Sequence, residues 1–222
     1  MISYLTEERK LSNLPGLGFW KLYDRLRRVG HPWNRGYRIY RELQLHQRAR
    51  RKKRVPTSQI WSADLMSDVL YRGSRFRTFN VLEDFNRETL AIEIDTSLTS
   101  GRLVRVFEQL AEQRPLPAML RTDNGPEFLG AEFTKWCKAH GVVIDYIEPG
   151  KPNQNAYIER FNRSYWTEVL SVYLFSSLNE VREITWRWML EYNEERGHDA
   201  LGKMTPIEFY NNAKVSTFEL ST

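Results

Sequence analysis

The chain has 222 residues, of which 41% are hydrophobic and 27% charged, enough for one sizeable core and a small appendage. This composition excludes disordered, collagenous and low-complexity proteins. No run of about 18 apolar residues occurs, and residues 1–10 are charged where a signal peptide is apolar, which argues against a membrane or secreted protein. A single cysteine, Cys137, and four histidines offer no disulfide and no zinc spacing, so we expect a cytoplasmic protein.

Charge is divided unevenly along the chain. Residues 1–57 carry 15 Lys and Arg against 4 Asp and Glu, whereas residues 58–222 carry 18 against 24. The two parts therefore have formal charges of +11 and −6, within a net charge of +5. A basic part joined to an acidic part indicates binding to a polyanion by the first and to cations by the second. Nucleic acid and metal ions are the candidates, and chance variation of a solvated surface is the alternative.

Two short helices are predicted within residues 1–47. Apolar residues recur at helical spacing over 18–29. After Asn34, a favourable N-cap, three basic residues follow at intervals of three: Arg35, Arg38 and Arg41. Two helices joined by a tight turn, the second of them basic, are typical of a helix-turn-helix segment that binds DNA. A helical hairpin with a solvated basic face is the alternative.

Residues 48–57 form a predicted basic linker. Six of the seven residues at 48–54 are basic, and Val55-Pro56 end the run. Such a run repels itself, so we expect an extended segment that neutralises DNA phosphates. Its candidate DNA-binding residues are Arg50, Arg51, Lys52, Lys53 and Arg54.

Residues 58–222 form the predicted α/β core. Three consecutive strands are predicted at 60–66, 76–82 and 89–95. Helices and strands then alternate: helix 101–113, strand 118–122, helix 131–140, strand 142–147, and helices at 152–170 and 178–196. This order predicts a mixed five-stranded sheet with helices on both faces.

Three carboxylates stand out by their local context. Asp64 lies inside an apolar strand, where an unpaired charge costs several kcal/mol, roughly its desolvation penalty. Asp123 ends the fourth strand just before an Asn-Gly-Pro turn, a place where α/β proteins bind ligands. Glu159 shares a helix face with Asn155 and Arg163. With 28 acidic residues in the chain, a salt-bridged strand residue, a turn cap and a solvated helix residue remain the alternatives.

These residues carry a resemblance to a known superfamily. The segments IWSAD (60–64), RTDNGPEF (121–128) and GKPNQNAYIERFN (150–162) resemble the three acidic blocks of DDE transposases and retroviral integrases, and 35 residues separate Asp123 from Glu159, as is typical there. Within the superfamily the chain most resembles the OrfB product of bacterial insertion sequences of the IS-three class. Residues 18–45 resemble its helix-turn-helix and residues 192–206 its C-terminal block, with Gly197 where the family usually has Pro.

The resemblance implies an RNase H-like fold and a polynucleotidyl transferase. In it, Asp64, Asp123 and Glu159 converge as catalytic residues and bind two Mg²⁺ ions, for which Mn²⁺ can substitute. The reaction is metal-dependent cleavage at the ends of the element, followed by strand transfer into target DNA. Asp68 is the second candidate for the first carboxylate, and Glu127 is a candidate to support the site or, alternatively, a solvated loop residue.

The implied partner is double-stranded DNA, both element ends and target. Lys151, Asn155 and Arg163 flank Glu159 and are candidates to hold phosphates. A homo-oligomer on DNA is expected, a partner or fusion from an upstream reading frame is left open, and the location is the bacterial cytoplasm at the nucleoid. Four aromatic residues near helical spacing are expected in the core rather than as base-stacking platforms: Trp166, Trp186, Trp188 and Tyr192.

Two other functions remain open from the sequence. One is a non-catalytic DNA-binding protein of a decayed element, in which the acidic centre is only structural. The other is a simple RNase H-like nuclease, which leaves the C-terminal block unexplained. The presence of all three carboxylates favours the transposase.

Overall fold

The computed structural model describes residues 60–148 and 152–219. The predicted helix-turn-helix segment and basic linker, with Arg35, Arg38, Arg41 and residues 50–54, lie outside the described residues. Within the described part, no helix is both long and apolar enough to span a lipid bilayer.

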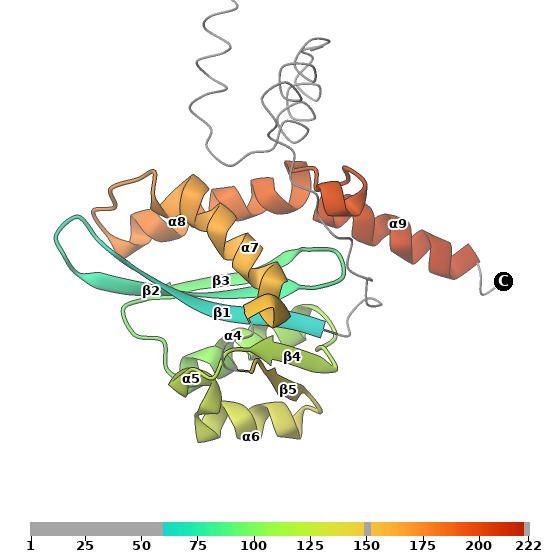
Figure 1. The fold of residues 1–222 in the computed structure, drawn as a ribbon, viewed down its shortest axis with the longest axis horizontal. Coiled ribbons are helices and arrows are strands. Elements are labelled where there is room, and N and C mark those ends of the chain that lie inside the picture. The colour runs from blue at the N-terminus through green and yellow to red at the C-terminus, as the bar shows by residue number, and fades with distance from the viewer. Residues whose placement is uncertain (1–59, 149–151, 220–222) are drawn as a thin grey trace, which may run out of the picture.

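A five-stranded mixed sheet forms the centre of the fold (Figure 1). Its strands are β1 (Ile60–Val69), β2 (Arg75–Glu83), β3 (Thr89–Asp95), β4 (Met119–Thr122) and β5 (Val143–Tyr146), in the order β3-β2-β1-β4-β5. β1, β2 and β3 pair antiparallel, as hairpin-linked strands do, whereas β4 pairs in parallel with β1 and β5 in parallel with β4. The sheet predicted from the strand and helix pattern is confirmed.

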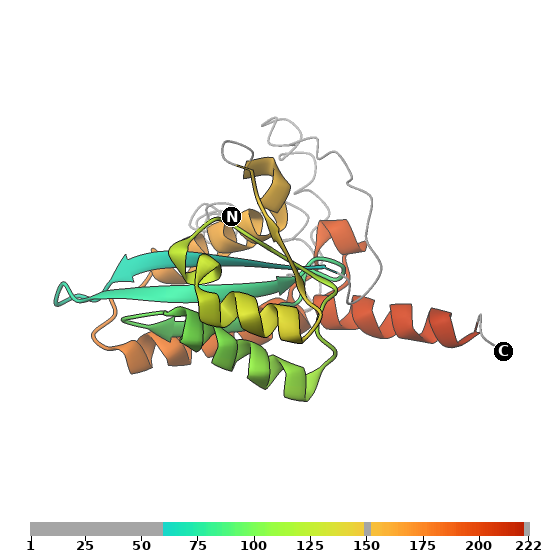
Figure 2. The same ribbon diagram turned by 90° about the horizontal axis from the view of Figure 1, so that it is seen from below.

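Helices cover both faces of the sheet. Figures 1 and 2 show α4 (Ser100–Gln113), α5 (Pro126–Leu129) and α6 (Ala131–Ala139) on one face, and α7 (Ala156–Tyr165) and α8 (Leu178–Leu190) on the other. α9 (Pro206–Glu219) follows a short 3₁₀ turn, Asp199–Leu201, and points away from the sheet. The two layers of helices are what a sheet with apolar residues on both faces requires.

The alternation of side chains along β1 and β2 builds two separate cores. Trp61, Ala63 and Phe79 point to the α4 side, where Phe107 packs against Trp61 and Phe79. On the other side, β-strand residues such as Phe76 meet a second cluster from the helices: Ile158, Phe161, Tyr165, Val169 and Val181. Because successive strand residues face opposite ways, Asp64 belongs to the α7 side of the sheet.

The helices predicted at 152–170 and 178–196 are present, but parts of them are 3₁₀ or π-helical turns rather than α-helix. Residues 152–170 begin with a 3₁₀ turn at Pro152–Asn155, continue as α7, and end in a π-helical turn at Trp166–Leu170, where Ser171 N–H donates to the Trp166 carbonyl at 2.8 Å. α8 likewise ends in a π-helical turn at Glu191–Glu195. Periodicity near 3.6 residues does not distinguish such turns from α-helix over so short a range.

α5 and α9 were not predicted from the sequence. α9 carries a local signal that could have predicted it, because Thr205 and Glu208 form a capping box around Pro206, which is the first residue of the helix. Thr205 Oγ1 accepts from Glu208 N–H at 3.1 Å, and Glu208 Oε2 accepts from Thr205 N–H at 2.7 Å. That pattern, Thr-x-x-Glu with Pro inside it, marks a helix start.

Candidate active site

Parallel pairing with β4 brings Asp123, just after the end of β4, toward the middle of β1, where Asp64 lies. Ser62 of β1 pairs with Arg121 of β4, and each aspartate lies two residues beyond its member of that pair. Asp64 and Asp123 therefore converge although 58 residues lie between them.

The Asp64 carboxylate is held by two hydrogen bonds. Its Oδ1 accepts from the Leu65 backbone N–H at 2.8 Å, and its Oδ2 accepts from the Asn162 side-chain amide at 2.7 Å. Burial is the main cause that raises the pKa of Asp64 to about 6; the charges of Asp123 and Glu159 also raise it, and these two hydrogen bonds lower it. Because both other carboxylates act on Asp64, the three predicted residues share one electrostatic site.

Asp123 lies in a tight turn directly after β4. Its Oδ1 accepts from the Gly125 N–H at 3.0 Å, and Asn124 donates to the Ile147 carbonyl at 3.0 Å. A Cβ at Gly125 would lie 3.0 Å from Asp123 Oδ1, closer than most carbon atoms approach an oxygen. The glycine thus lets the turn close on the carboxylate.

Glu159 is exposed and lies in the first turn of α7. The partial positive charge of a helix N-terminus favours a carboxylate there. Asn162 follows three residues later on the same helix and bonds Asp64, so the helix face that carries Glu159 is turned toward β1.

The three carboxylates do not form a ready-made metal cage. Within residues 60–148 and 152–219, no three acidic, His or Cys side chains lie close enough together to hold an ion. Without a cation the three carboxylates repel one another, and the side chain of Glu159 is exposed, so it can point away from Asp64 and Asp123. The donor set itself, three carboxylates with hard oxygens, is the kind that Mg²⁺ prefers.

Of the two reserve candidates, Asp68 and Glu127, only Glu127 lies near Asp123: a Cβ at Gly125 would be 3.0 Å from Asp123 Oδ1 and 3.2 Å from Glu127 Oε2. Asp68 accepts from the Val69 N–H and acts electrostatically on Tyr165 rather than on Asp64. Glu127 forms an ion pair with Arg77 of β2, whose charge and hydrogen bond lower the pKa of Glu127 against the opposing effect of burial. Their surroundings favour Asp64 as the first carboxylate and give Glu127 a structural partner.

The three predicted phosphate-binding residues differ in their exposure to a ligand. Lys151 lies outside the described residues. Arg163 is exposed on α7 and available to a ligand. Asn155, however, is only 3% exposed at the start of α7, so its side chain is shielded from a DNA backbone in this conformation.

The expectation for the aromatic residues is correct for two of four. Trp188 packs against Phe161 and Tyr192 is buried. Trp166 and Trp186 are 43% and 57% exposed, so their placement in the core was wrong. For Trp186 the reason is angular: residues 186 and 188 are about 200° apart on a helix, so only one of them can face the core, and Trp188 does so against Phe161 and Tyr165 of α7.

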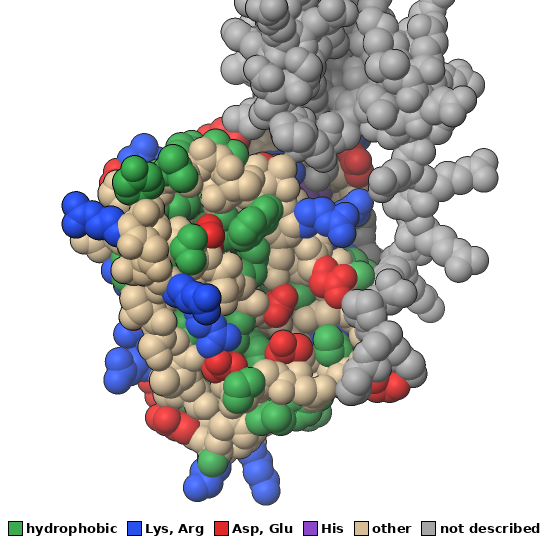
Figure 3. All heavy atoms as spheres, turned by 60° about the vertical axis from the view of Figure 1, so that its left-hand side comes forward, with side chains coloured by type: hydrophobic (Ala, Val, Ile, Leu, Met, Phe, Trp, Pro, Cys, Tyr) green, Lys and Arg blue, Asp and Glu red, His purple; other side chains and the backbone are tan. Residues whose placement is uncertain are grey.

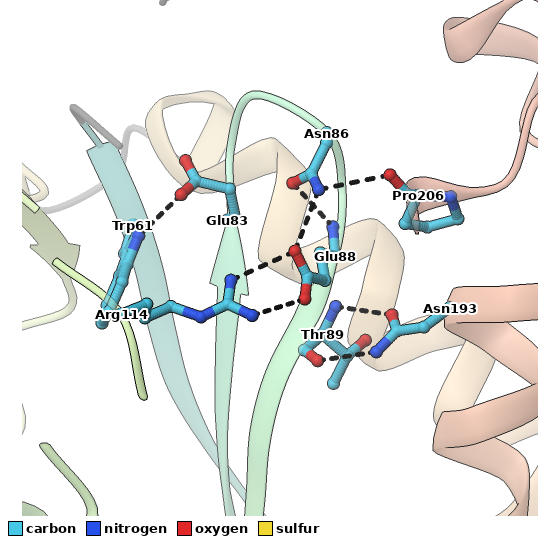
Figure 4. A network of polar contacts seen from close by, with 8 residues as sticks. All are labelled: Trp61, Glu83, Asn86, Glu88, Thr89, Arg114, Asn193 and Pro206. Atoms are coloured by element: carbon cyan, nitrogen blue, oxygen red, sulfur yellow. Dashed lines mark hydrogen bonds and ion pairs between the residues drawn. The ribbon is translucent and has the colours of Figure 1, made fainter. Parts of the chain in front are cut away.

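The C-terminal block docks onto the turn between β2 and β3 (Figure 4). Asn193 brackets Thr89, accepting from its N–H and donating to its carbonyl, both at 2.9 Å. Asn86 donates to the Pro206 carbonyl at 3.3 Å, and Glu88 pairs with Arg114 at 2.6 Å. Residues 192–206 therefore tie the last helices to the sheet.

Acidic and basic side chains occupy different parts of one face of the molecule. Figure 3 shows a group of acidic side chains in the middle of one face, with Lys and Arg side chains on either side of it. An acidic centre between basic flanks suits a cation at the centre and phosphates around it.

Two residues of the site were missed by the sequence reading. Asn80 of β2 and Asn162 of α7 form a hydrogen-bonded chain that ends on Asp64. The available signal was a lone Asn in the apolar strand 76–82, together with an Asn one helical turn after Glu159.

Comparison with known proteins identifies the family. Two models described as "Integrase core domain" match residues 57–152 and 140–206. A 31.7 kDa protein of insertion element IS407 from Burkholderia multivorans is 35% identical over 206 residues, which cover 86% of this chain and 74% of that protein. The chain belongs to the insertion-sequence transposases with an integrase core. A 39.2 kDa protein of IS476 from Xanthomonas euvesicatoria is 36% identical over 88% of this transposase, which spans 60% of that relative's length.

Solved retroviral integrases share the fold of this transposase. A chain of the simian T-cell lymphotropic virus intasome, in complex with a PP2A regulatory subunit, matches 74% of it and 59% of the viral chain with a TM-score of 0.57 and 16% identity. The HTLV-2 integrase catalytic core in complex with magnesium matches 71% of it and 99% of the viral chain with a TM-score of 0.51 and 17% identity. The RNase H-like fold is thereby confirmed.

Proposed function

We propose that this family member is a DNA transposase that cuts DNA at the ends of its insertion sequence and joins those ends to target DNA. The observation that carries the proposal is electrostatic: the charges of Asp123 and Glu159 both act on the half-buried carboxyl group of Asp64. Only a folded chain that brings β1, the turn after β4 and α7 together produces that coupling. Catalysis of phosphoryl transfer needs charge and positioning of this kind.

The three carboxylates fit a divalent-metal site, and we assign Asp64, Asp123 and Glu159 as its ligands. The grouping of negative charge favours a doubly charged cation, and hard oxygen donors favour Mg²⁺, with Mn²⁺ able to substitute. The magnesium complex of the HTLV-2 integrase core, which shares the fold, supports this choice. Two bound ions would polarise a scissile phosphate and offset the charge that builds up on the attacking and leaving oxygens.

The chain's own residues set the geometry of that reaction. The Leu65 N–H and the Asn162 amide hold the plane of the Asp64 carboxylate. The Gly125 N–H holds the Asp123 carboxylate from within the turn after β4. Glu159 is exposed and adjusts its position from the start of α7. Two carboxylates are thus preorganised and the third closes the site.

DNA binding is proposed to use both parts of the chain. Arg163 lies on α7, the helix of Glu159, and is exposed, so it is suited to a phosphate next to the reacting one. The main affinity is assigned to the basic residues of 35–54, with Arg35, Arg38 and Arg41 of the predicted second helix reading the element ends. Strand transfer of paired ends calls for a homo-oligomer on DNA, with an upstream-frame partner left open.

The proposed location is the bacterial cytoplasm at the nucleoid, where the DNA substrate lies. The bacterial source of the relatives from insertion elements IS407 and IS476 supports this placement.

A gel assay tests the function directly. The full chain is incubated with labelled element ends, a target plasmid and Mg²⁺, and the products are separated by size. Joined products support the transposase, cut but unjoined ends support a simple nuclease, and a mobility shift without cutting supports a DNA-binding protein whose acidic centre is structural. Omitting the divalent ion and adding EDTA gives the matched control, in which a transposase leaves the ends intact.

A further inference from the structure

Three side chains from three different elements form a hydrogen-bonded chain that ends on the first carboxylate. Asn80 of β2 donates from its amide to Asn162 Oδ1 at 2.7 Å. Asn162 of α7 donates from its amide to Asp64 Oδ2, also at 2.7 Å. Asn80 is fully buried and Asn162 is 8% exposed, so water does not compete freely with either bond.

The direction of this chain is set by Asp64. An ionised carboxylate only accepts hydrogen bonds, so Asn162 must present its NH₂ group to Asp64 and turn its carbonyl oxygen away. That oxygen lies in a largely apolar layer between β2 and α7, where a missing donor is costly. Asn80, which stands directly across from Asp64 in the β1–β2 register, supplies the donor.

A buried asparagine at position 80 lowers the stability of the fold. Its own Oδ1 is buried and finds no hydrogen-bond partner among the described residues. An apolar side chain in the same place would avoid that cost. This loss of stability is offset if the amide of Asn80 orients another group. Within residues 60–148 and 152–219, the only side chain to which Asn80 is hydrogen-bonded is Asn162.

We propose that Asn80 is a positioning residue of the metal site, acting through Asn162 on Asp64. With Asn80 in place, Asn162 has one orientation, the Asp64 carboxylate has a fixed plane, and α7 stays close to β1. Since Glu159 lies one helical turn before Asn162, the same bond sets the distance between the first and third carboxylates. This inference rests on the proposed function, because it concerns the metal that the carboxylates are assigned to hold.

Replacing Asn80 by leucine tests the inference, since Asn80→Leu keeps the size of the side chain and removes the donor. Binding of Mn²⁺ to the full chain without DNA is measured by titration calorimetry, and the Mg²⁺ concentration for half-maximal joining is measured beside it. Groups that hold a ligand in place typically change metal affinity about 10- to 100-fold. We expect Mn²⁺ binding and the half-maximal Mg²⁺ concentration to shift by roughly tenfold or more, with joining at saturating Mg²⁺ reduced much less.

Thr78→Val is the matched control. Thr78 lies two residues away on the same face of β2, is fully buried, and has an Oγ1 without a hydrogen-bond partner in the described part of the chain. The control changes a buried polar group of the same strand without touching Asn162. We expect its Mn²⁺ affinity to equal that of the wild type. An equal loss in Thr78→Val and Asn80→Leu would overturn the inference, because general damage to β2 would then explain both.

A double-mutant cycle shows whether Asn80 acts through Asn162. Once Asn162→Ala has removed the intermediate, Asn80→Leu should weaken Mn²⁺ binding little further, whereas independent roles would give additive losses. Additive losses would overturn the inference. If Asn80→Leu does not fold, as thermal melting would reveal, Asn80→Ala replaces it in every measurement, because truncation leaves a cavity rather than a clash.

The experiment separates this inference from the proposed function. Asp64→Asn is titrated in parallel. If the wild type and Asp64→Asn bind Mn²⁺ equally, the assignment of Asp64 as a ligand fails and the inference fails with it. If Asp64→Asn loses binding and folded Asn80→Leu binds as the wild type does, the metal site stands and only the positioning role of Asn80 is refuted.

Discussion

Asp64 in the middle of β1 and Asp123 just after β4 are each two residues beyond the paired residues Ser62 and Arg121, and the charge of Asp123 raises the pKa of Asp64. Burial is the largest cause of that shift, and Glu159 adds to it, so that the pKa of Asp64 reaches about 6. A folded chain without a cation therefore holds carboxylates that oppose one another's ionisation. The arrangement that we propose for metal binding weakens the metal-free fold.

Neutralising Asp64 should stabilise the metal-free protein. Because the folded-state pKa of about 6 lies above the ordinary value of 3.8, the wild type loses stability as the pH rises from about 4 to about 6 and does not regain it above. At pH 7.5 in EDTA, Asp64→Asn should raise the free energy of unfolding by on the order of 1–3 kcal/mol. Mg²⁺ should raise the melting temperature of the wild type more than that of the variant.

Thermal melts in EDTA and in Mg²⁺ measure both effects. Asp68→Asn serves as control, since Asp68 is not among the groups that act on Asp64. A variant Asp64→Asn that melts below the wild type in EDTA and responds equally to Mg²⁺ would mean that Asp64 is structurally paired.

Removal of any one of the three carboxylates should stop the chemistry and spare DNA binding. Asp64→Asn, Asp123→Asn and Glu159→Gln should each lower cleavage and joining by on the order of 10²–10³-fold or more, since each removes charge from the reacting centre. Binding to labelled ends should change little, because most affinity is assigned to residues 35–54. Asp68→Asn should keep activity; if it is inactive while Asp64→Asn is active, the first ligand is misassigned.

Glu83 should make stability depend on pH near neutrality. Burial raises the pKa of Glu83 from 4.5 to about 7, against the lowering effect of the Trp61 indole N–H, which donates to Glu83 Oε2 at 2.8 Å. Below pH 4.5 this group opposes folding least, and stability is lost as the pH rises from about 4.5 to about 7. The loss is at most about 3 kcal/mol.

Glu83→Gln removes this titration and keeps an acceptor for Trp61. Urea unfolding at pH 5 and pH 8, both in EDTA, should show the variant gaining on the wild type as the pH rises. The difference between the two proteins isolates Glu83 from the other titrating groups. A difference that does not change with pH would refute the assignment.

Gly197 should tolerate no side chain. A Cβ there would lie 2.5 Å from the backbone oxygen of Lys203, and the turn is closed by the hydrogen bond from His198 N–H to the Met204 carbonyl at 2.9 Å. Gly197→Ala should lower the free energy of unfolding by about 1–3 kcal/mol, as overpacking does. Gly101→Ala is the contrast, because its Cβ meets only the flexible end of Glu132 and alanine favours α4. Equal effects in denaturant melts would contradict the turn geometry.

The two basic segments should differ in what they recognise. Neutral substitutions at residues 50–54 in the full chain should flatten the dependence of log K on log salt by up to about 4 units, since each phosphate contact contributes about −0.9. Neutral substitutions at Arg35, Arg38 and Arg41 should reduce the preference for element ends over random DNA more than they reduce general affinity. Equal loss on both DNAs would make that helix a simple phosphate clamp.

Local patterns in the sequence were sufficient for the sheet and for the candidate carboxylates. Strand alternation around Trp61 and Phe79 depends on neighbours within a few residues, as does the turn after Asp123, so both are readable without the fold. The acidic blocks around Asp64, Asp123 and Glu159 were likewise visible, because chemistry of this kind is tied to short motifs.

Tertiary packing decided what joins those pieces. That Asn80 reaches Asn162 depends on α7 crossing β2, and that Trp166 and Trp186 are exposed depends on which helix face meets the sheet. The burial of Glu83 and the hydrogen bond from Thr89 N–H to Asn193 both depend on residues that are far apart in the chain. Hydrogen bonds and desolvation act over a few ångströms in space, whatever the separation in sequence, so only the folded chain determines them.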